Sequence, residues 1–244
     1  MLTARCLPCG SNRLVTIGTP PQRLSLQIDT GSSDIWTQVS SSVLCNSQGD
    51  PCSVSGTYNN LTSSSYQYVN SDFLIQYGDG TGAQGDYCKE TLGIAGVSIN
   101  GVQIALGLAA TSTEGVLGIR AQDILISLLG IGYSTNQAIS IFQGQSGYPS
   151  LLDNMVSKKL IAARAFSLYL DDLNANTGSL LFGGIDTAKY SGDLLTLPVL
   201  NDGSTFTSFA VAMTSLSITK PGSNSATTLA ASSFPISVIL DSGS

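Results

Sequence analysis

One short phrase occurs twice in this chain of 244 residues, as LQIDTGSSDIW at residues 26–36 and as VILDSGS at residues 238–244. In both copies an apolar run leads into Asp, a hydroxyl residue, Gly and Ser. The apolar run predicts a buried strand, and the glycine allows a tight turn where another backbone or a ligand approaches. An Asp at the end of such a strand is costly to bury without a partner. The repeat therefore predicts two strand-loop units that bring Asp29 and Asp241 together.

Two carboxyl groups that face each other at short distance share one proton, because like charges resist ionising together. The ionised partner can then accept a proton from water, while the protonated partner donates to a carbonyl oxygen. Such a pair can hydrolyse a peptide bond without a metal or a covalent intermediate. A lone Asp-Ser-Gly is usually only a turn, but the apolar strand before each copy favours the chemical role.

The composition excludes several large classes of function. The chain has no histidine, which rules out Ser-His-Asp and Cys-His nucleophile pairs and His-ligated zinc. A net charge of -6 leaves nothing to neutralise a row of phosphates, so we expect no nucleic-acid partner. No apolar stretch reaches the length of about eighteen residues that a transmembrane helix needs. We expect no metal and no cofactor.

Short apolar runs separated by Gly, Pro, Asn and Ser, such as FSLYL at residues 166–170, predict an all-β protein. The best helix candidate is residues 148–161, whose apolar side chains fall on one face: Leu151, Leu152, Met155, Val156 and Leu160. We place a domain boundary so that residues 1–165 carry the first Asp phrase and residues 166–244 carry the second.

The chain has five cysteines. Cys45 and Cys52 bracket a polar, turn-rich loop, so we expect a local disulfide there if the compartment is oxidising. The CxxC spacing of Cys6 and Cys9 is also found in redox and metal pairs, but no second CxxC and no βαβ pattern accompany it. The pairing of Cys6, Cys9 and Cys88 stays open.

Two features bear on export from the cell. Asn60-Leu61-Thr62 is an N-glycosylation sequon, which is weak evidence of secretion. The first residues, MLTARCLPCGSNRLV, lack the apolar run and the cleavage site of a secretory signal. If the protein is exported, we therefore expect its signal to be missing from this chain.

Five motifs, taken in order, resemble those of the pepsin-like aspartic proteases, and in detail the secreted or surface-anchored fungal branch that includes the yapsins. The motifs are VTIGTPPQ at 15–22, IDTGSSDIW at 28–36, QYGDGTGAQGDY at 76–87, FSLYLDD with GSLLFGGIDTAKYSGDL at 166–172 and 178–194, and ILDSGS at 239–244. The resemblance spans most of the chain. It implies the bilobal pepsin-like acid protease fold, with the amino-terminal lobe nearly complete and the carboxyl-terminal lobe partial.

By this resemblance Asp29 and Asp241 are the catalytic pair. Thr30 and Ser242 would lock the two loops together through hydrogen bonds. Gly31 and Gly243 would leave room for the substrate backbone, and Ser32 and Ser244 would orient the carboxylates.

The resemblance also implies a β-hairpin flap that closes over the substrate. It would carry Tyr77, Gly78 and Asp79, with Trp36 packed behind Tyr77 as its hydrogen-bond partner. The simpler interpretation is that Tyr77 is a cross-strand aromatic and Trp36 a core residue. We expect the other acids of these motifs to be solvated or capping carboxylates: Asp34, Asp79, Asp171 and Asp172.

The sequence departs from the family pattern in three places. Residues 1–12 replace the usual start, so we expect a first strand of the sheet between the lobes to be missing or altered. Arg120–Ile131 separates Ile119 from Gly132 where relatives read straight through, and we interpret this segment as a retained intron or a gene-model error. The chain stops just after Asp241, so we expect fraying there and a chain that is inactive or poorly folded as written.

The leading hypothesis is an aspartic-type endopeptidase with an acid optimum that acts on polypeptide substrates. We expect a monomer, located outside the cell or on its surface, with membrane contact only through a lipid anchor absent from this chain. The alternative is a protein of the same fold that only binds or inhibits. The serine-rich composition also permits a third hypothesis, a structural cell-wall protein.

Overall fold

The computed structural model describes residues 2–6, 15–47, 51–53, 55–78, 80–110, 127–170, 178–229 and 231–243. The described strands are β1 Leu2–Cys6, β2 Val15–Ile17, β3 Gln22–Leu24, β4 Gln27–Asp29, β5 Ile35–Gln38, β6 Gln67–Gln76, β7 Gly82–Ile94, β8 Val97–Ala110, β9 Ser127–Gly130, β10 Phe166–Tyr169, β11 Gly178–Phe182, β12 Ala210–Met213, β13 Leu216–Thr219, β14 Ala226–Leu229 and β15 Ile236–Ile239. The described helices are α1 Ala138–Gln143 and α2 Leu151–Ser157, with short 3-10 turns η1 Asn60–Thr62, η3 Ser134–Asn136, η4 Thr187–Lys189 and η5 Ala231–Ser233.

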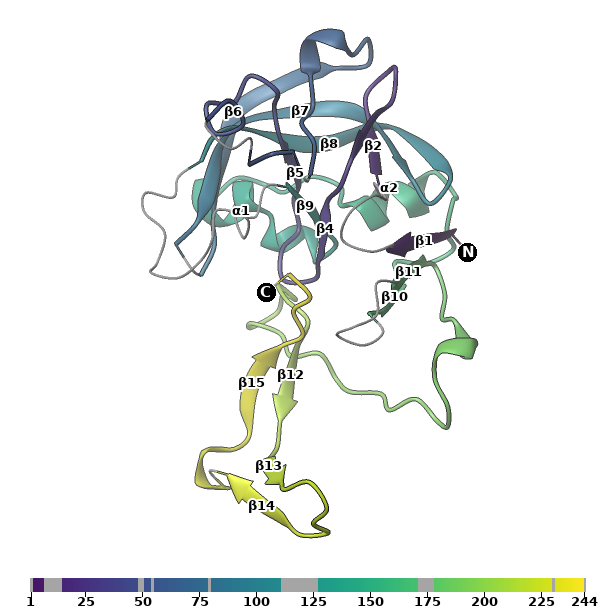
Figure 1. Ribbon diagram of the computed structural model, residues 1–244, viewed down its shortest axis with the longest axis vertical. Helices are drawn as coiled ribbons and strands as arrows, with labels where there is room; N and C mark the ends of the chain where they lie inside the picture. The colour runs from purple at the N-terminus through teal and green to yellow at the C-terminus, as the bar shows by residue number, and fades with distance from the viewer. Residues whose placement is uncertain are drawn as a thin grey trace.

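The predicted all-β class is confirmed. The largest sheet runs in the order β3-β2-β7-β8-β5-β9-β4, and β6 pairs with β7 at its side. Figure 1 shows this curled sheet in the upper part of the molecule, with α1 and α2 beneath it. Strand β7 alternates buried and more exposed residues from Cys88 to Ile94, and β6 does so near its end, as expected for a sheet with one face on the core.

An aromatic cluster fills part of the core under this sheet. Trp36 packs against Phe73 at 5.9 Å between ring centroids, Phe73 against Tyr87 at 5.4 Å, and Tyr87 against Tyr148 at 5.6 Å. Aromatic pairs of this kind contribute about 1 kcal/mol each beyond their burial. The cluster joins β5, β6 and β7 to the segment before α2, and so fixes the base of the β6–β7 hairpin.

The predicted helix exists but is shorter than residues 148–161. Ser150 caps the amino end of α2, because its hydroxyl accepts from the Asp153 N–H while the Asp153 carboxylate accepts from the Ser150 N–H. Leu151 and Met155 are buried as expected. The helix ends at Ser157, and Lys159 follows with a φ of 59°.

Strand β9 corrects the boundaries of the suspected extra segment. The chain carries LGI at residues 117–119 and again at 129–131, and the second copy forms the core strand. Leu128, Leu129 and Ile131 are all buried, and β9 pairs with both β4 and β5. Ser127–Ile131 therefore belongs to the fold, whereas residues 111–126 lie outside the described part and the origin of that segment stays a hypothesis.

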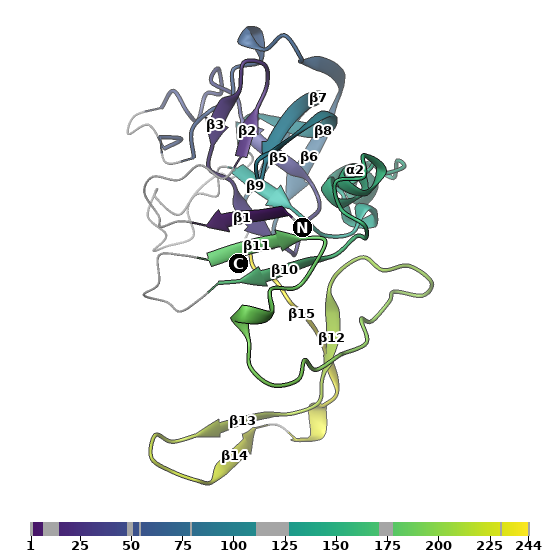
Figure 2. The ribbon, with the colours of Figure 1, turned by 90° about the vertical axis from the view of Figure 1, so that its right-hand side faces the viewer.

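A second sheet has three strands in the order β1-β11-β10. Figure 2 shows it beneath the large sheet. Leu2–Cys6 pairs antiparallel with Gly178–Phe182, which itself pairs with Phe166–Tyr169. The amino-terminal segment therefore forms a strand, so of the two expectations, missing or altered, the first is wrong, and the second stays a prediction.

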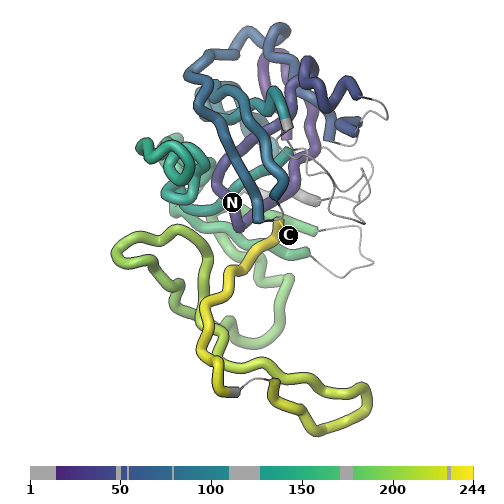
Figure 3. Tube along the Cα trace, turned by 90° about the vertical axis from the view of Figure 1, so that its left-hand side faces the viewer, coloured from purple at the N-terminus to yellow at the C-terminus, as the bar shows by residue number. Residues whose placement is uncertain are grey.

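Residues 183–243 extend away from this compact part. They contain two separate two-stranded sheets, β12-β15 and β13-β14, and every residue of β13 and β14 is exposed. The tube in Figure 3 shows the chain running outward and returning, so that its carboxyl end lies against the compact part. This return brings the second Asp phrase to the first.

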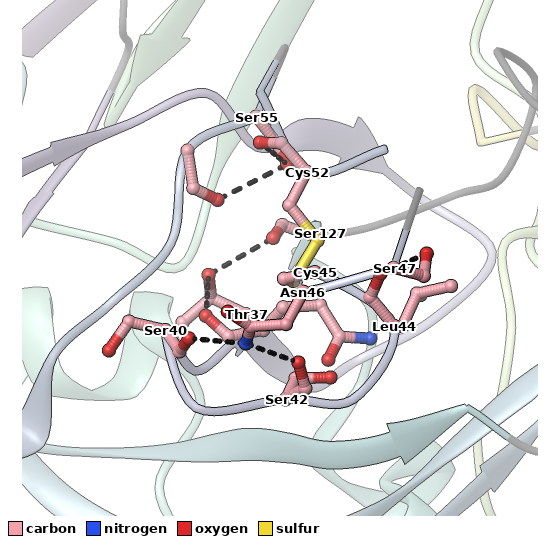
Figure 4. The surroundings of a disulfide bond; sticks show 12 residues. Thr37, Ser40, Ser42, Leu44, Cys45, Asn46, Ser47, Cys52, Ser55 and Ser127 are labelled. Atoms are coloured by element: carbon pink, nitrogen blue, oxygen red, sulfur yellow. Dashed lines mark hydrogen bonds between the residues drawn. A yellow bond between two sulfur atoms is a disulfide. The ribbon is translucent and has the colours of Figure 1, made fainter. Parts of the chain in front are cut away.

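The predicted disulfide between Cys45 and Cys52 is present (Figure 4). Its loop is held by the Asn46 side chain, whose Nδ2 donates to the carbonyl oxygens of Ser40 at 2.9 Å and Ser42 at 2.8 Å. Cys88 is buried as a free thiol, and burial raises its pKa. Cys9 and the side chain of Cys6 lie outside the described part.

Candidate active site

The first Asp loop, residues 29–34, begins where β4 ends. The parallel pairing of β4 with β9 places Asp29 beside Gly130, and the Ile131 N–H donates to the Asp29 carbonyl oxygen at 3.0 Å. The Gly31 N–H donates to Asp29 Oδ1 at 2.7 Å. Strand pairing and this turn hold the Asp29 carboxyl group at the edge of the core, where the residue is only 5% exposed.

The second Asp loop, residues 241–243, follows β15. The Leu240 N–H donates to the Phe209 carbonyl oxygen at 3.0 Å, which keeps the end of the strand paired. The Gly243 N–H donates to Asp241 Oδ1 at 2.8 Å, the same contact that Gly31 makes with Asp29. The shared phrase thus produces the same local turn twice, although Asp241 is exposed.

Two hydroxyls lock the loops together reciprocally. Thr30 Oγ1 donates to the Leu240 carbonyl oxygen at 2.7 Å and accepts from the Ser242 N–H at 2.9 Å. Ser242 Oγ donates to the Ile28 carbonyl oxygen at 3.0 Å and accepts from the Thr30 N–H at 3.2 Å. Residues more than two hundred positions apart are joined by these four hydrogen bonds, and the structure brings together the pair that the sequence singled out.

Each glycine leaves the space into which the opposite Asp fits. A Cβ at Gly31 would lie 2.7 Å from the Asp241 carboxyl, and a Cβ at Gly243 would collide with Asp29 Oδ1. In this structure, therefore, the room at each glycine is occupied by the facing carboxyl group. The implied room for a substrate backbone stays a prediction.

The pKa of Asp29 is raised above its usual range. Burial is the largest cause, and the charge of Asp241 and a hydrogen bond to it act in the same direction. The Ser32 hydroxyl and the Gly31 N–H partly oppose this, because both favour the ionised form. Within the described part, Ser32 Oγ has no hydrogen-bond partner of ordinary geometry, although it lies close enough to act on Asp29. Ser244 is outside the described residues.

The implied flap is the turn between β6 and β7. The Tyr77 N–H donates to the Thr81 carbonyl oxygen at 2.8 Å, and the Gly80 N–H donates back to the Tyr77 carbonyl oxygen at 3.0 Å. Gly80 has a φ of 85°, which only glycine adopts readily. Trp36 Nε1 donates to the Tyr77 hydroxyl at 2.7 Å. The exposed Gly78 lies in this turn, and Asp79 lies outside the described residues.

The family model described as eukaryotic aspartyl protease matches residues 13–244. The chain belongs to this family.

Several relatives of this aspartyl protease chain are fungal. It is 43% identical over 230 residues to a probable aspartic-type endopeptidase opsB of Aspergillus oryzae, covering 94% of this chain and 45% of that protein. It is 42% identical over 192 residues to secreted aspartic protease 3 of Candida albicans, covering 77% of this chain and 44% of that protein. The chain thus spans about half the length of the curated relatives it matches.

A solved structure supports the fold of this aspartyl protease chain. The crystal structure of the aspartic proteinase from Irpex lacteus matches with a TM-score of 0.60 at 20% identity, covering 83% of this chain and 53% of that one. At this identity the match shows the fold alone. The predicted pepsin-like fold is confirmed.

The sequence predicts Asp34 to be a solvated or capping carboxylate, and the structure shows a buried capping one. Asp34 is fully buried and not solvated. It accepts from the Tyr148 hydroxyl at 2.6 Å, from the Tyr87 hydroxyl at 3.1 Å and from the Ala138 N–H at 2.7 Å, so it caps α1. Burial raises the pKa of Asp34, although these donors oppose the shift.

Asp171 and Asp172 lie outside the described residues. Among those that the structure describes, no group of three His, Cys, Asp or Glu side chains is arranged to hold a metal ion. No described helix of this aspartyl protease chain is long and apolar enough to cross a membrane.

Proposed function

We propose that the protein is an aspartic-type endopeptidase that hydrolyses polypeptides in acid, with Asp29 and Asp241 as its catalytic pair. The observation that carries the proposal is the reciprocal locking of two Asp loops, which presents the two carboxyl groups to each other. Membership of the aspartyl protease family supports it. We also propose that the protein acts as a monomer and binds neither nucleic acid nor metal.

The chemistry follows from one shared proton. Burial raises the pKa of Asp29, which favours holding the proton on that side of the pair. The more exposed Asp241 then accepts a proton from a water molecule as this water attacks the peptide carbonyl carbon. Asp29 donates to the carbonyl oxygen and stabilises the charge that develops there. The apparent pKa values belong to the pair and not to either residue.

The substrate would lie under the β6–β7 turn. The Trp36–Tyr77 hydrogen bond ties this turn to β5, the strand that follows the first Asp loop. A hairpin turn with exposed glycines such as Gly78 and Gly80 can close over an extended peptide and exclude water from the cleft. Tyr77, Gly78 and Asp79 are the residues that we propose to contact the substrate.

We propose a location outside the cell or on its surface, as for the relative named a secreted aspartic protease. The Cys45–Cys52 disulfide supports an oxidising compartment. The sequon at Asn60 lies on the 3-10 turn η1, where the neighbouring Leu61 is 89% exposed, and we propose it as a glycosylation site. We also propose that residues 1–165 form one lobe and residues 166–244 part of another, with β10 as its first strand.

The test is digestion of a denatured protein by the full-length protein at about pH 4, with and without a transition-state inhibitor of aspartic proteases. Asp29→Asn and Asp241→Asn should each reduce the rate by about 1000-fold or more, and the double variant should be no slower than either one. Asp193→Asn is the matched control, since Asp193 is exposed and outside both loops. A folded wild-type protein that binds the inhibitor but cleaves nothing would favour the binding protein, and one that neither binds nor cleaves would contradict both.

A further inference from the structure

Two side-chain amides reach the glycines of the Asp loops. Gln27 Nε2 donates to the Gly243 carbonyl oxygen at 2.9 Å, and Asn136 Nδ2 donates to the Gly31 carbonyl oxygen at 3.0 Å. Each loop glycine thus receives one amide donor. Gln27 lies in the run before the first Asp, Asn136 lies outside both phrases, and both come from the part of the chain that carries the first Asp loop.

The two amides lie on elements that the sheet already fixes. Gln27 is the first residue of β4, two positions before Asp29. Asn136 ends the 3-10 turn η3, which follows β9 directly. The Gly132 N–H donates to the Ser32 carbonyl oxygen at 2.9 Å, so the chain entering η3 already runs along the first Asp loop.

The same 3-10 turn also contacts the segment that leads to the second loop. Thr135 Oγ1 donates to the Phe206 carbonyl oxygen at 2.5 Å, and the Tyr133 ring lies 5.0 Å from the Phe209 ring. Phe209 in turn accepts from the Leu240 N–H, next to Asp241. Residues 133–136 are therefore connected to both Asp loops.

A held carbonyl matters at these two positions because glycine rotates freely. The N–H of each glycine donates to the Asp of its own loop, and that contact holds the peptide plane before the glycine. The amide donor holds the peptide plane after it. With both planes fixed, the φ and ψ of the glycine are fixed as well, and the turn cannot swing its N–H away from the carboxylate.

We propose that Gln27 and Asn136 are positioning residues that fix the two loop glycines and thereby hold the paired carboxyl groups in their reactive geometry. This inference rests on the proposed function for its effect on catalysis. Its effect on the carboxyl groups themselves is independent of catalysis. Among the described residues, Asp241 is the ionisable group whose charge acts on the pKa of Asp29.

The direction of the effect follows from the glycine contacts. An N–H that donates to a carboxylate stabilises its ionised form and lowers its pKa. When a glycine loses its amide donor, its N–H contact with the Asp weakens, and the apparent pKa of the carboxyl pair rises. The pH profile then moves to higher pH, because the pair keeps its protons to higher pH.

The experiment removes the donors and keeps the side-chain volume, with Gln27→Met and Asn136→Leu in the whole chain. Two controls lose an amide contact elsewhere: Gln145→Met, whose Nε2 donates to Asp72 Oδ2 at 3.0 Å, and Asn46→Leu, whose Nδ2 donates to the Ser40 carbonyl oxygen at 2.9 Å. Carboxyl-carbon NMR follows the titration of Asp29 and Asp241, and thermal unfolding reports stability.

We expect upward pKa shifts in the two positioning variants and none in the controls. We also expect kcat to fall about tenfold while KM changes little, since one hydrogen bond of the reactive geometry is lost. Asn136→Gln, which keeps the donor, should restore part of the loss.

Carboxyl groups that titrate as in the wild type in both positioning variants would overturn the inference, even if stability falls. If Asn136→Leu does not fold, the titration of the carboxyl groups in Gln27→Met alone tests the inference. If the folded wild type cleaves nothing, the proposed function fails, while the titration still tests the positioning role.

Discussion

The two Asp loops have the same turn and very different surroundings. The first loop lies among core strands, with Asp29 5% and Thr30 8% exposed. The second loop has the same glycine contact on its Asp, but Asp241 is exposed and Leu240 is 57% exposed. The phrase therefore determines the local turn, whereas the neighbouring strands determine the burial.

Because of this difference in burial, we expect the loss of equivalent hydrogen bonds to have unequal effects in the two loops. The groups that lie on the first-loop side of the shared hydrogen bonds are shielded from water, and those on the second-loop side are accessible to it. A buried polar group that loses its partner costs about 1–3 kcal/mol, whereas an exposed one can turn to water. The two glycines differ in the same way. Gly31 faces the exposed carboxyl group of Asp241, which has room to move, whereas Gly243 faces the buried carboxyl group of Asp29, which does not.

Replacing the glycine of each Asp loop by alanine should give the largest difference in cleavage rate between the two loops. Gly243→Ala puts a Cβ against the buried Asp29, which cannot move aside, so the second loop must leave and we expect the cleavage rate to fall by about 100-fold or more. Gly31→Ala meets the exposed Asp241, which can rotate away, and should cost about tenfold. Steady-state kinetics beside urea unfolding would check this, and equal losses would show that burial does not distinguish the loops.

The locking hydroxyls should show a smaller effect on stability. Ser242→Ala leaves the buried Ile28 carbonyl and Thr30 N–H without partners and should lower the free energy of unfolding by about 2 kcal/mol. Thr30→Val leaves only the Leu240 carbonyl and the Ser242 N–H of the exposed loop without partners. It should lower the free energy of unfolding by about 1 kcal/mol. Urea denaturation measures both. The reverse order would mean that the second loop is the better shielded one.

The buried acid at the end of the first loop should contribute the smallest effect, as a pH dependence. Burial raises the pKa of Asp34, so above about pH 4 the unfolded chain releases a proton that the folded protein keeps. The free energy of unfolding therefore falls as pH rises through the folded-state pKa. Asp34→Asn should flatten this slope in urea titrations between acid and neutral pH. Tyr148→Phe, which removes a donor that lowers the pKa of Asp34, should extend the slope to higher pH.

Much of the fold was predictable because its signals are local. The alternating runs predict the strands, and the apolar face of residues 148–161 predicts the helix that forms at Leu151–Ser157. The polar loop between Cys45 and Cys52 predicts their disulfide. Each of these features depends on residues within a few positions of one another.

The parts that were missed depend on distant pairing. Asp34 can be buried because the hydroxyls of Tyr87 and Tyr148 donate to it from other elements. No residue near Asp34 in the sequence indicates these contacts. Glu90 is likewise fully buried and accepts from the hydroxyls of Tyr58, Ser63 and Ser65. Which LGI copy forms β9 also depends on its pairing with β4 and β5.

The candidate site was predicted as a pair of acids but not as an unequal pair. Two copies of one phrase imply two equivalent Asp residues. Their difference comes from β9, which covers the first loop and pairs with β4. The amides of Gln27 and Asn136 were missed for the same reason, since each reaches its glycine only across the fold.

The central claim is that Asp29 and Asp241 interact closely enough to share a proton. The direct measurement is the carboxyl-carbon NMR titration of Asp29 in the wild type and in Asp241→Asn. Because the charge of Asp241 raises the pKa of Asp29, its replacement by a neutral amide should lower the pKa of Asp29. An Asp29 that titrates identically in both proteins would contradict the account.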